Sequence, residues 1–188
     1  EVIDGDMTTA LTSHYFMPGG GDVTTSEQKD ELRHELEVFD AECDAIVAGM
    51  PEGLSTYDKY RYLAVVISLR TTYDYDSVGG TQIGTAYGAR AALDMQGYSR
   101  GFEYLCKKAN LWCKTVSGES RNVSHAWNLV RLESGTYHVD VTWSDGYDIP
   151  PDGLDWFDYF MLTQDEILID HDIEDGTVAT GTHIDPPI

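Results

Sequence analysis

Positive charge is scarce in this sequence. Its 188 residues include 12 Lys and Arg against 33 Asp and Glu, which gives a formal net charge of −21 at pH 7. Proteins that bind nucleic acid use clustered Lys and Arg, and twelve such residues scattered through an acidic chain do not supply a cluster. We therefore expect no nucleic-acid partner.

Long apolar runs are also missing. No stretch approaches the roughly 18 apolar residues that a membrane-spanning helix needs, so we expect no membrane span. The sequence starts at Glu1 rather than at Met, and we interpret it as one module of a longer polypeptide whose other modules are its partners. The acidic, Tyr-, Thr- and Gly-rich composition favours a secreted microbial protein, and we expect an extracellular or cell-surface location.

Cysteine is scarce as well. Cys43, Cys106 and Cys113 are an odd number, which does not indicate a disulfide framework. We interpret them as small apolar side chains of the core.

The acidic residues do not follow a known metal-binding pattern. The run Tyr73–Asp76 lacks the regularly spaced ligands of a calcium-binding loop. His171 stands between two aspartates, but a single histidine among acids is usually a surface residue, and we interpret it in this way. We expect no metal and no cofactor.

The chain divides into three regions. Residues 1–25 are polar and glycine-rich, and we expect a flexible segment. Apolar residues spaced three and four apart, followed by alternating ones, indicate a domain over residues 26–172. Residues 173–188 show no periodicity, which predicts an extended arm or linker.

Within the domain, helices come first and strands follow. The predicted helices run from Ser26 to about Gly49, from Ser55 to Leu69 and from Met95 to about Ala109, and the predicted strands cover residues 111–116, 124–132 and 137–143. This order is typical of the α+β class.

Three short runs carry residues that suit nucleophilic catalysis: Met95–Ser99 at a helix start, His125–Asn128 on one strand, and Tyr137–Trp143 on the next. A helix N-terminus and a nearby imidazolium lower the pKa of a thiol. An imidazole then transfers the proton, and a carboxylate orients the imidazole.

The three runs resemble the transglutaminase-like superfamily, which shares the papain-like fold of cysteine peptidases. The family pattern is Cys-x-Gly-Tyr, His-Ala-Trp-Asn and Tyr-x-x-Asp-x-Thr-Trp. Here the matching residues are Gln96–Tyr98, His125–Asn128 and Tyr137–Trp143. The resemblance extends from about Ser55 to Trp143, and more loosely through residues 160–171. It implies a central helix packed on an antiparallel sheet, and peptidase, transamidase or deamidase activity. It also implies that His125 is the base and Asp140 the orienting carboxylate.

The chain departs from the family pattern at Met95, which occupies the position of the nucleophilic cysteine. A thioether has no proton to lose and cannot carry an acyl group. Loss of the nucleophile from such a site typically costs about 10⁶ in turnover. Ser99 lies one helical turn further on, roughly 6 Å away, and Cys106 lies about three turns away. We therefore predict a pseudoenzyme that serves as a binding or structural module.

Two alternatives remain open. One is an active peptidase, amidase or transamidase that uses an unrecognised nucleophile. The other is a carbohydrate-associated accessory module with exposed aromatic rings. The candidate binding residues, near a cleft that would take a peptide or protein ligand, are Gln96, Tyr98, Trp127 and Trp143, although we interpret most of the aromatic residues as core.

The strand register raises a difficulty for the predicted site. A two-residue turn at Ser134-Gly135 pairs Leu129 with Asp140 and leaves His125 four residues away, about 13 Å along the strand. The two side chains meet only if the strands contain a bulge, use a different turn or coil strongly. We expect one of these three features.

Overall fold

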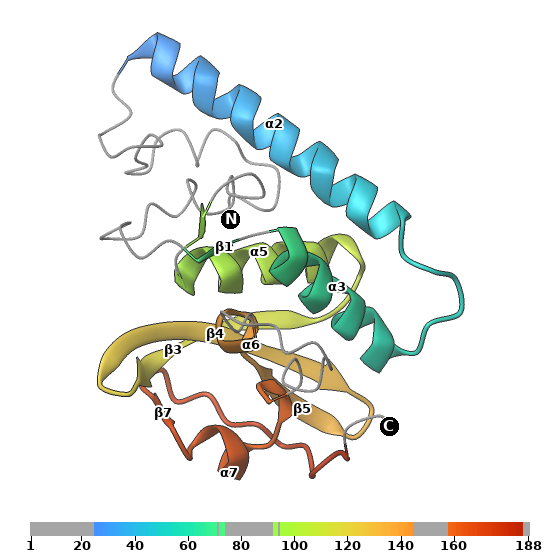
Figure 1. Cartoon of the computed structure of the whole chain (residues 1–188), viewed down its shortest axis with the longest axis vertical. Helices are drawn as coiled ribbons and strands as arrows, with labels where there is room; N and C mark the ends of the chain where they lie inside the picture. Colours follow the sequence, from blue (N-terminus) through green and yellow to red (C-terminus); the bar gives the residue numbers. More distant parts are fainter. Residues whose placement is uncertain (1–24, 71, 74–91, 94, 145–157, 186–188) are drawn as a thin grey trace.

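The computed structural model describes residues 25–70, 72–73, 92–93, 95–144 and 158–185 (Figure 1). The predicted N-terminal segment therefore lies outside the described residues, except for Thr25. The elements are α2 (Ser26–Ala48), α3 (Thr56–Arg70), β1 (Thr72–Tyr73), β2 (Ala92–Leu93), α5 (Met95–Lys108), β3 (Cys113–Ser120), β4 (Val123–Leu132), β5 (Gly135–Val139), α6 (Val141–Ser144), β6 (Phe160–Leu162), α7 (Gln164–Ile167) and β7 (His171–Ile173).

The predicted α+β class is confirmed. Helices α2, α3 and α5 lie together on one side of a five-stranded sheet of order β6-β5-β4-β3-β7 (Figure 1), whose neighbouring strands are all antiparallel. The short strands β1 and β2 form a separate parallel pair. None of the described helices is both long enough and apolar enough to span a membrane.

The first two helices begin at side-chain caps. Thr25 caps α2: its hydroxyl accepts the backbone N–H of Gln28, and the Gln28 side chain accepts the backbone N–H of Thr25. In the same way Ser55 Oγ accepts the backbone N–H of Asp58 at the start of α3. Both caps satisfy backbone donors that a helix leaves unpaired, and the cap of α2 is reciprocal.

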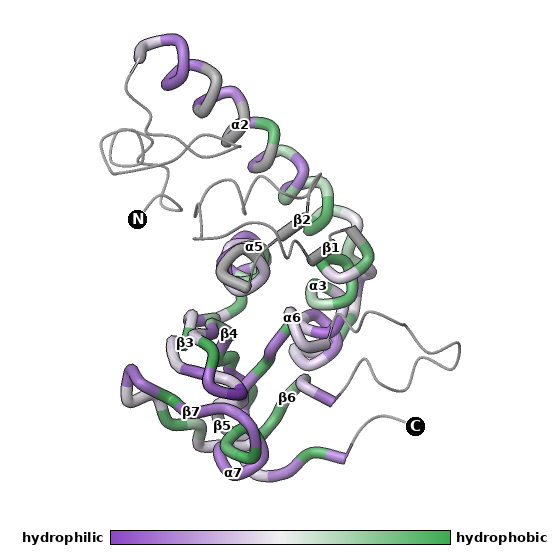
Figure 2. The backbone as a smooth tube through the Cα atoms, turned by 60° about the vertical axis from the view of Figure 1, so that its left-hand side comes forward, coloured by the Kyte–Doolittle hydropathy of each residue, from purple (hydrophilic) through white to green (hydrophobic). Residues whose placement is uncertain are grey.

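Helix α5 packs against β4 and β3 through one apolar face. Tyr98, Phe102, Leu105 and Cys106 on this face are all buried, as their spacing of three and four residues predicts. The C-terminal half of α2 adds two buried side chains to the same core, and Figure 2 shows that α2 becomes more apolar toward α3. The central helix is therefore held on the sheet by the core itself.

Two turns set the register of the sheet, and the second differs from the sequence prediction. β3 continues through Gly118 to Ser120 and turns at Arg121-Asn122, where both residues have positive φ. Leu132 pairs with Gly135, so the turn between β4 and β5 is Glu133-Ser134 rather than Ser134-Gly135. β5 then ends at Val139, and the predicted third strand gives way to α6.

The C-terminal segment after Ile173 contains no regular element up to residue 185, but it lies against the sheet. The backbone N–H of Gly181 donates to the carbonyl of Thr136 in β5 at 2.9 Å. The backbone N–H of Ala179 donates to Oε1 of Gln164 at 2.7 Å. The segment therefore packs on the domain through these hydrogen bonds.

Candidate functional site

Asp140 is the most firmly held residue of the site. It lies between β5 and α6, where Oδ1 accepts the backbone N–H of Trp143 at 3.2 Å and so caps the short helix. Its backbone N–H donates to the carbonyl of Tyr159, and its own carbonyl accepts both the backbone N–H and the hydroxyl of Ser144. The second carboxylate oxygen, Oδ2, remains for the histidines.

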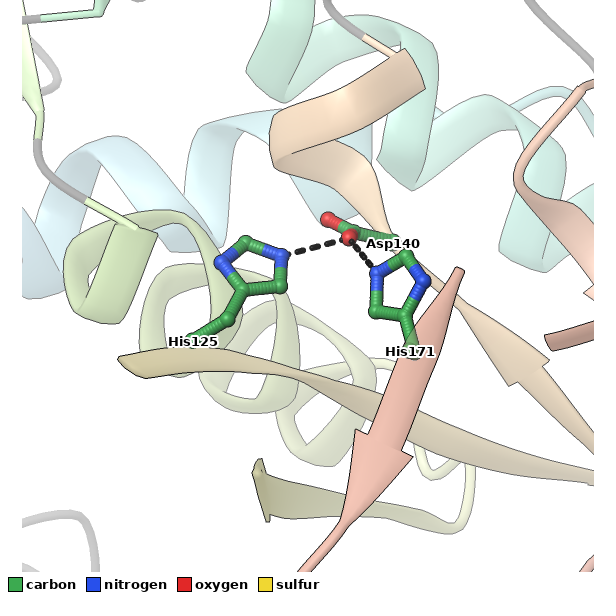
Figure 3. A group of neighbouring side chains, drawn as sticks. All are labelled: His125, Asp140 and His171. Carbon is green, nitrogen blue, oxygen red and sulfur yellow. Dashed lines mark hydrogen bonds and ion pairs between the residues drawn. The ribbon is translucent and has the colours of Figure 1, made fainter. Parts of the chain in front are cut away.

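His125 in β4 contacts this second oxygen. Its Nε2 lies 2.6 Å from Asp140 Oδ2 (Figure 3), and the imidazole and carboxylate side chains are only 5% and 0% exposed. The other ring nitrogen, Nδ1, points away from Asp140 (Figure 3). The predicted base and orienting carboxylate are therefore brought together, with Nδ1 as the nitrogen that Asp140 leaves available.

The turn at Glu133-Ser134 explains how the pair meets. Asn128 pairs with Val139, so one further step along both strands sets Trp127 opposite Asp140 and makes His125 its diagonal neighbour. Diagonal Cα atoms in an antiparallel pair are about 7–8 Å apart, which long side chains can span. Of the three features that the sequence requires, the structure contains the different turn.

His171 is the residue that the sequence analysis placed incorrectly. It is buried, with 1% exposure, rather than on the surface. Its Nε2 lies 3.0 Å from the same Oδ2 of Asp140, and its Nδ1 lies 2.6 Å from Oδ1 of Asp170. The strand β7 brings it there, because Ser120 pairs with His171 across the β3–β7 ladder.

Charge within the site favours ionised Asp140. Burial alone would raise the pKa of this carboxyl, but the charges and hydrogen bonds of His125 and His171 outweigh burial and lower its pKa below the ordinary value. Burial likewise opposes the charged form of His171, but the hydrogen bonds and charges of Asp140 and Asp170 raise its pKa. Asp140 therefore acts as an acceptor for both imidazoles.

Aromatic rings surround the three side chains. The ring of Trp127 stacks on His125 with centroids 5.9 Å apart and meets His171 at 4.9 Å. Trp143 approaches His125 and His171 edge-on, at 6.1 and 5.5 Å. The guanidinium of Arg121 lies 4.2 Å above the Trp143 ring. These aromatic contacts help to cover the two histidines, which are both buried.

A third buried histidine, His138, belongs to the scaffold. Its Nδ1 accepts the indole N–H of Trp127 at 3.0 Å, and its Nε2 donates to Gln164 Oε1 at 3.2 Å. Burial lowers its pKa, which agrees with a neutral ring that accepts at Nδ1. His138 thereby fixes the indole that stacks on His125.

The candidate binding residues differ in their surroundings. Tyr98 and Trp127 are fully buried, so they belong to the core and offer no surface to a ligand, which corrects their assignment as binding residues. Trp143 is partly exposed. Met95 is the first residue of α5, but its side chain and that of Gln96 lie outside the described residues.

A buried amide links the start of α5 to the strand of the candidate base. Asn128 Nδ2 donates to the backbone carbonyl of Ser99 at 2.8 Å, and Asn128 is fully buried. Ser99 lies one turn into the helix that begins at Met95. The hydrogen bond therefore sets the position of the first turns of α5 relative to β4.

The residue types in the site also occur as ligands of transition metals. Suitable donor atoms of His125, Asp140 and His171 lie within 4.8 Å of one another. Two ligands of a tetrahedral zinc ion are about 3.3 Å apart, whereas Nε2 and Oδ2 here are separated by 2.6 and 3.0 Å. The described geometry is that of a hydrogen-bonded cluster.

Comparison with known proteins finds partial similarity. No family model matches the chain. In an alignment 62 residues long that covers 27% of this chain, the sequence is 37% identical to kyphoscoliosis peptidase of Homo sapiens and, to the same extent, of Mus musculus. The chain spans about a tenth of the length of these relatives, because the match covers 9% of each.

A solved structure described as "Crystal structure of a TGase" covers 64% of this chain and 34% of its own, with a TM-score of 0.40 and 17% identity. At this TM-score the two structures superpose only loosely. The sequence comparison supports a partial similarity between this chain and proteins named as peptidases.

Proposed function

We propose that this chain is a transglutaminase-like module that has kept the imidazole and the carboxylate of the family's site and has lost the nucleophile. In this proposal it is a non-catalytic binding or structural unit of a larger secreted bacterial protein. Because the relatives are named peptidases, the ligand that we propose is a peptide or protein segment.

The observation that carries the proposal is the contact of 2.6 Å between His125 Nε2 and Asp140 Oδ2 in a chain with Met at position 95. The contact supports His125 and Asp140 as the base and the orienting carboxylate. A Met side chain in place of a thiol removes the step in which an acyl group is carried. His125 and Asp140 can then orient a polar ligand without catalysing its conversion.

Two of the three cysteines, Cys43 and Cys106, give little support to an active enzyme with a different nucleophile. Burial raises the pKa of Cys43 to about 12. Burial and the neighbouring Cys113 raise the pKa of Cys106 well above its ordinary value. Both are core side chains, and a thiol in such surroundings stays protonated and unreactive at neutral pH.

The carbohydrate-binding alternative needs exposed aromatic rings. Trp112 is the most exposed tryptophan of the described residues, at 39%, but the guanidinium of Arg131 lies 4.3 Å above its ring. One ring that already stacks with a side chain does not make a sugar platform. The proposal therefore keeps the site of His125 and Asp140 as the functional centre.

The test is turnover by the unmodified chain. The wild-type protein is incubated at pH 7 with casein and a fluorescent primary amine, and amine incorporation, ammonia release and new peptide ends are measured. The proposal predicts rates equal to those of buffer and equal to those of His125→Ala. Turnover by the wild-type protein that His125→Ala abolishes would show an active enzyme.

A further inference from the structure

The cluster contains one more histidine than the imidazole and carboxylate pair requires. His171 uses both of its ring nitrogens: Nε2 lies 3.0 Å from Asp140 Oδ2, and Nδ1 lies 2.6 Å from Asp170 Oδ1. The two carboxylates contact opposite sides of the imidazole ring. Asp140 directly follows β5, and Asp170 directly precedes β7. Ionised carboxylates accept hydrogen bonds and donate none.

Two acceptors on opposite sides require two donors on the ring. A neutral imidazole has a single N–H, and only the imidazolium has two. We propose that His171 is a buried imidazolium, held between Asp170 and Asp140, and that it acts as a positioning residue for His125 by fixing the carboxylate that both imidazoles share. This inference rests on the proposed function only in treating His125 as the base of the site.

The surroundings of His171 support a positive charge on its ring. The groups that face it are Asp140 before α6, Asp170 before β7, His125 in β4 and the hydroxyl of Tyr159, which donates to Asp170 Oδ2. His138 in β5 acts on it at longer range. The carboxylates supply two negative charges to one imidazolium, and they raise the pKa of His171 against the effect of burial.

The charge has a consequence for His125. Asp140 Oδ2 accepts a hydrogen bond from each imidazole, and Oδ1 is occupied by the helix cap at Trp143. With His171 in place, the carboxylate cannot rotate without breaking a charged hydrogen bond, which is stronger than a neutral one. His125 is therefore kept with its proton on Nε2 and with Nδ1 turned away from Asp140.

Ring nitrogen spectra test the inference without any measurement of activity. In the full chain with ¹⁵N-labelled histidine, His171 is expected to show two protonated ring nitrogens at pH 7.5, and His125 a single tautomer with its proton on Nε2. His171→Phe keeps the ring contacts with Trp127 and removes both donors, so the His125 signals should move toward those of a mixture of tautomers. His171→Gln restores one donor to Asp140 and should bring them back.

Two further variants keep the test decisive. Asp170→Asn leaves the cluster intact and should let His171 lose its second proton at a lower pH. His138→Asn removes a different buried histidine and should leave the His171 signals in place. A neutral His171 at pH 7.5 in the wild-type protein, or an unchanged His125 tautomer in folded His171→Phe, would overturn the inference. Turnover by the wild-type chain would refute the proposed function and leave these spectra unaffected.

Discussion

Gly118 faces His125 across the β3–β4 ladder, and on its other side it pairs with Ile173 of β7. A Cβ atom at Gly118 would lie 2.0 Å from the carbonyl oxygen of Asp172 and 2.8 Å from the Trp127 ring. The missing side chain is therefore what allows β7, which carries His171, to lie so close to β3 beside Gly118.

This relationship predicts that Gly118→Ala is destabilising. The backbone of β7 must move, so we expect a loss of about 3 kcal/mol in the free energy of unfolding, at the upper end of the cost of overpacking. The measurement is urea unfolding. The matched control is Gly101→Ala in α5, where no atom lies within 4 Å of the added Cβ and a gain of about 0.5–1 kcal/mol is expected. Equal stability of the two variants would contradict the close approach.

Asp140→Asn tests the carboxylate at the centre of the cluster. The amide keeps the shape but removes the charge that two buried imidazoles share. Because breaking a buried ion pair on one side is costly, we expect a loss of about 3 kcal/mol in urea unfolding at pH 6. The control, Asp172→Asn, changes an exposed carboxylate of β7 and should stay within about 0.5 kcal/mol of the wild type. A loss no larger than that of the control would show that the cluster is not held by this charge.

The pKa of His171 predicts how stability depends on pH. Its pKa in the folded state is raised above the ordinary 6.5, so its contribution is full below pH 6.5 and is lost as the pH rises through the folded value. The pKa of Asp140 is lowered from 3.8, so its contribution is present above pH 3.8 and is lost as the pH falls through the folded value. Burial lowers the pKa of His138, which has the opposite sign to His171 and removes stability below pH 6.5.

A comparison of two proteins separates these effects. His138 is the same in the wild type and in Asp170→Asn, so the difference between their unfolding free energies reports mainly on His171. We expect this difference to shrink by about 1 kcal/mol between pH 6 and pH 9, as the wild type loses the charged pair. The measurement is urea unfolding at several pH values. A difference that stays constant over this range would mean that His171 does not titrate there.

The sequence predicts those parts of the fold that depend on neighbouring residues. Helix starts follow from local caps such as Thr25 and Ser55, and the buried face of α5 follows from its spacing. The position of the β4–β5 turn does not. Gly135 suits either turn, and its φ of 134° is set beside Gly181, whose backbone nitrogen would lie 2.7 Å from a Cβ at Gly135. That contact joins residues 46 positions apart.

The candidate site, like the fold, could be predicted from the sequence only in part. The resemblance of the motifs led to His125 and Asp140, which the structure brings into contact. His171 could not be found by periodicity, because β7 has three residues and its burial depends on pairing with Ser120, far away in the sequence. The sequence analysis placed Trp143 on a strand, whereas it lies in α6. Asp140, which caps this helix, is a residue type that favours helix starts, but the end of β5 depends on contacts with distant residues.

The central claim is that His125 and Asp140 would still activate a thiol at position 95, and that the site is inactive because Met95 has no thiol. The direct measurement is alkylation of Met95→Cys by iodoacetamide at pH 6, with the labelled residue located by mass spectrometry. A thiolate supported by His125 should react about 10-fold or more faster than free cysteine, and Met95→Cys combined with His125→Ala should lose the gain. Cys43 and Cys106 are buried with raised pKa values, and the wild-type chain gives the background. A rate at position 95 no faster than that of free cysteine would contradict the account.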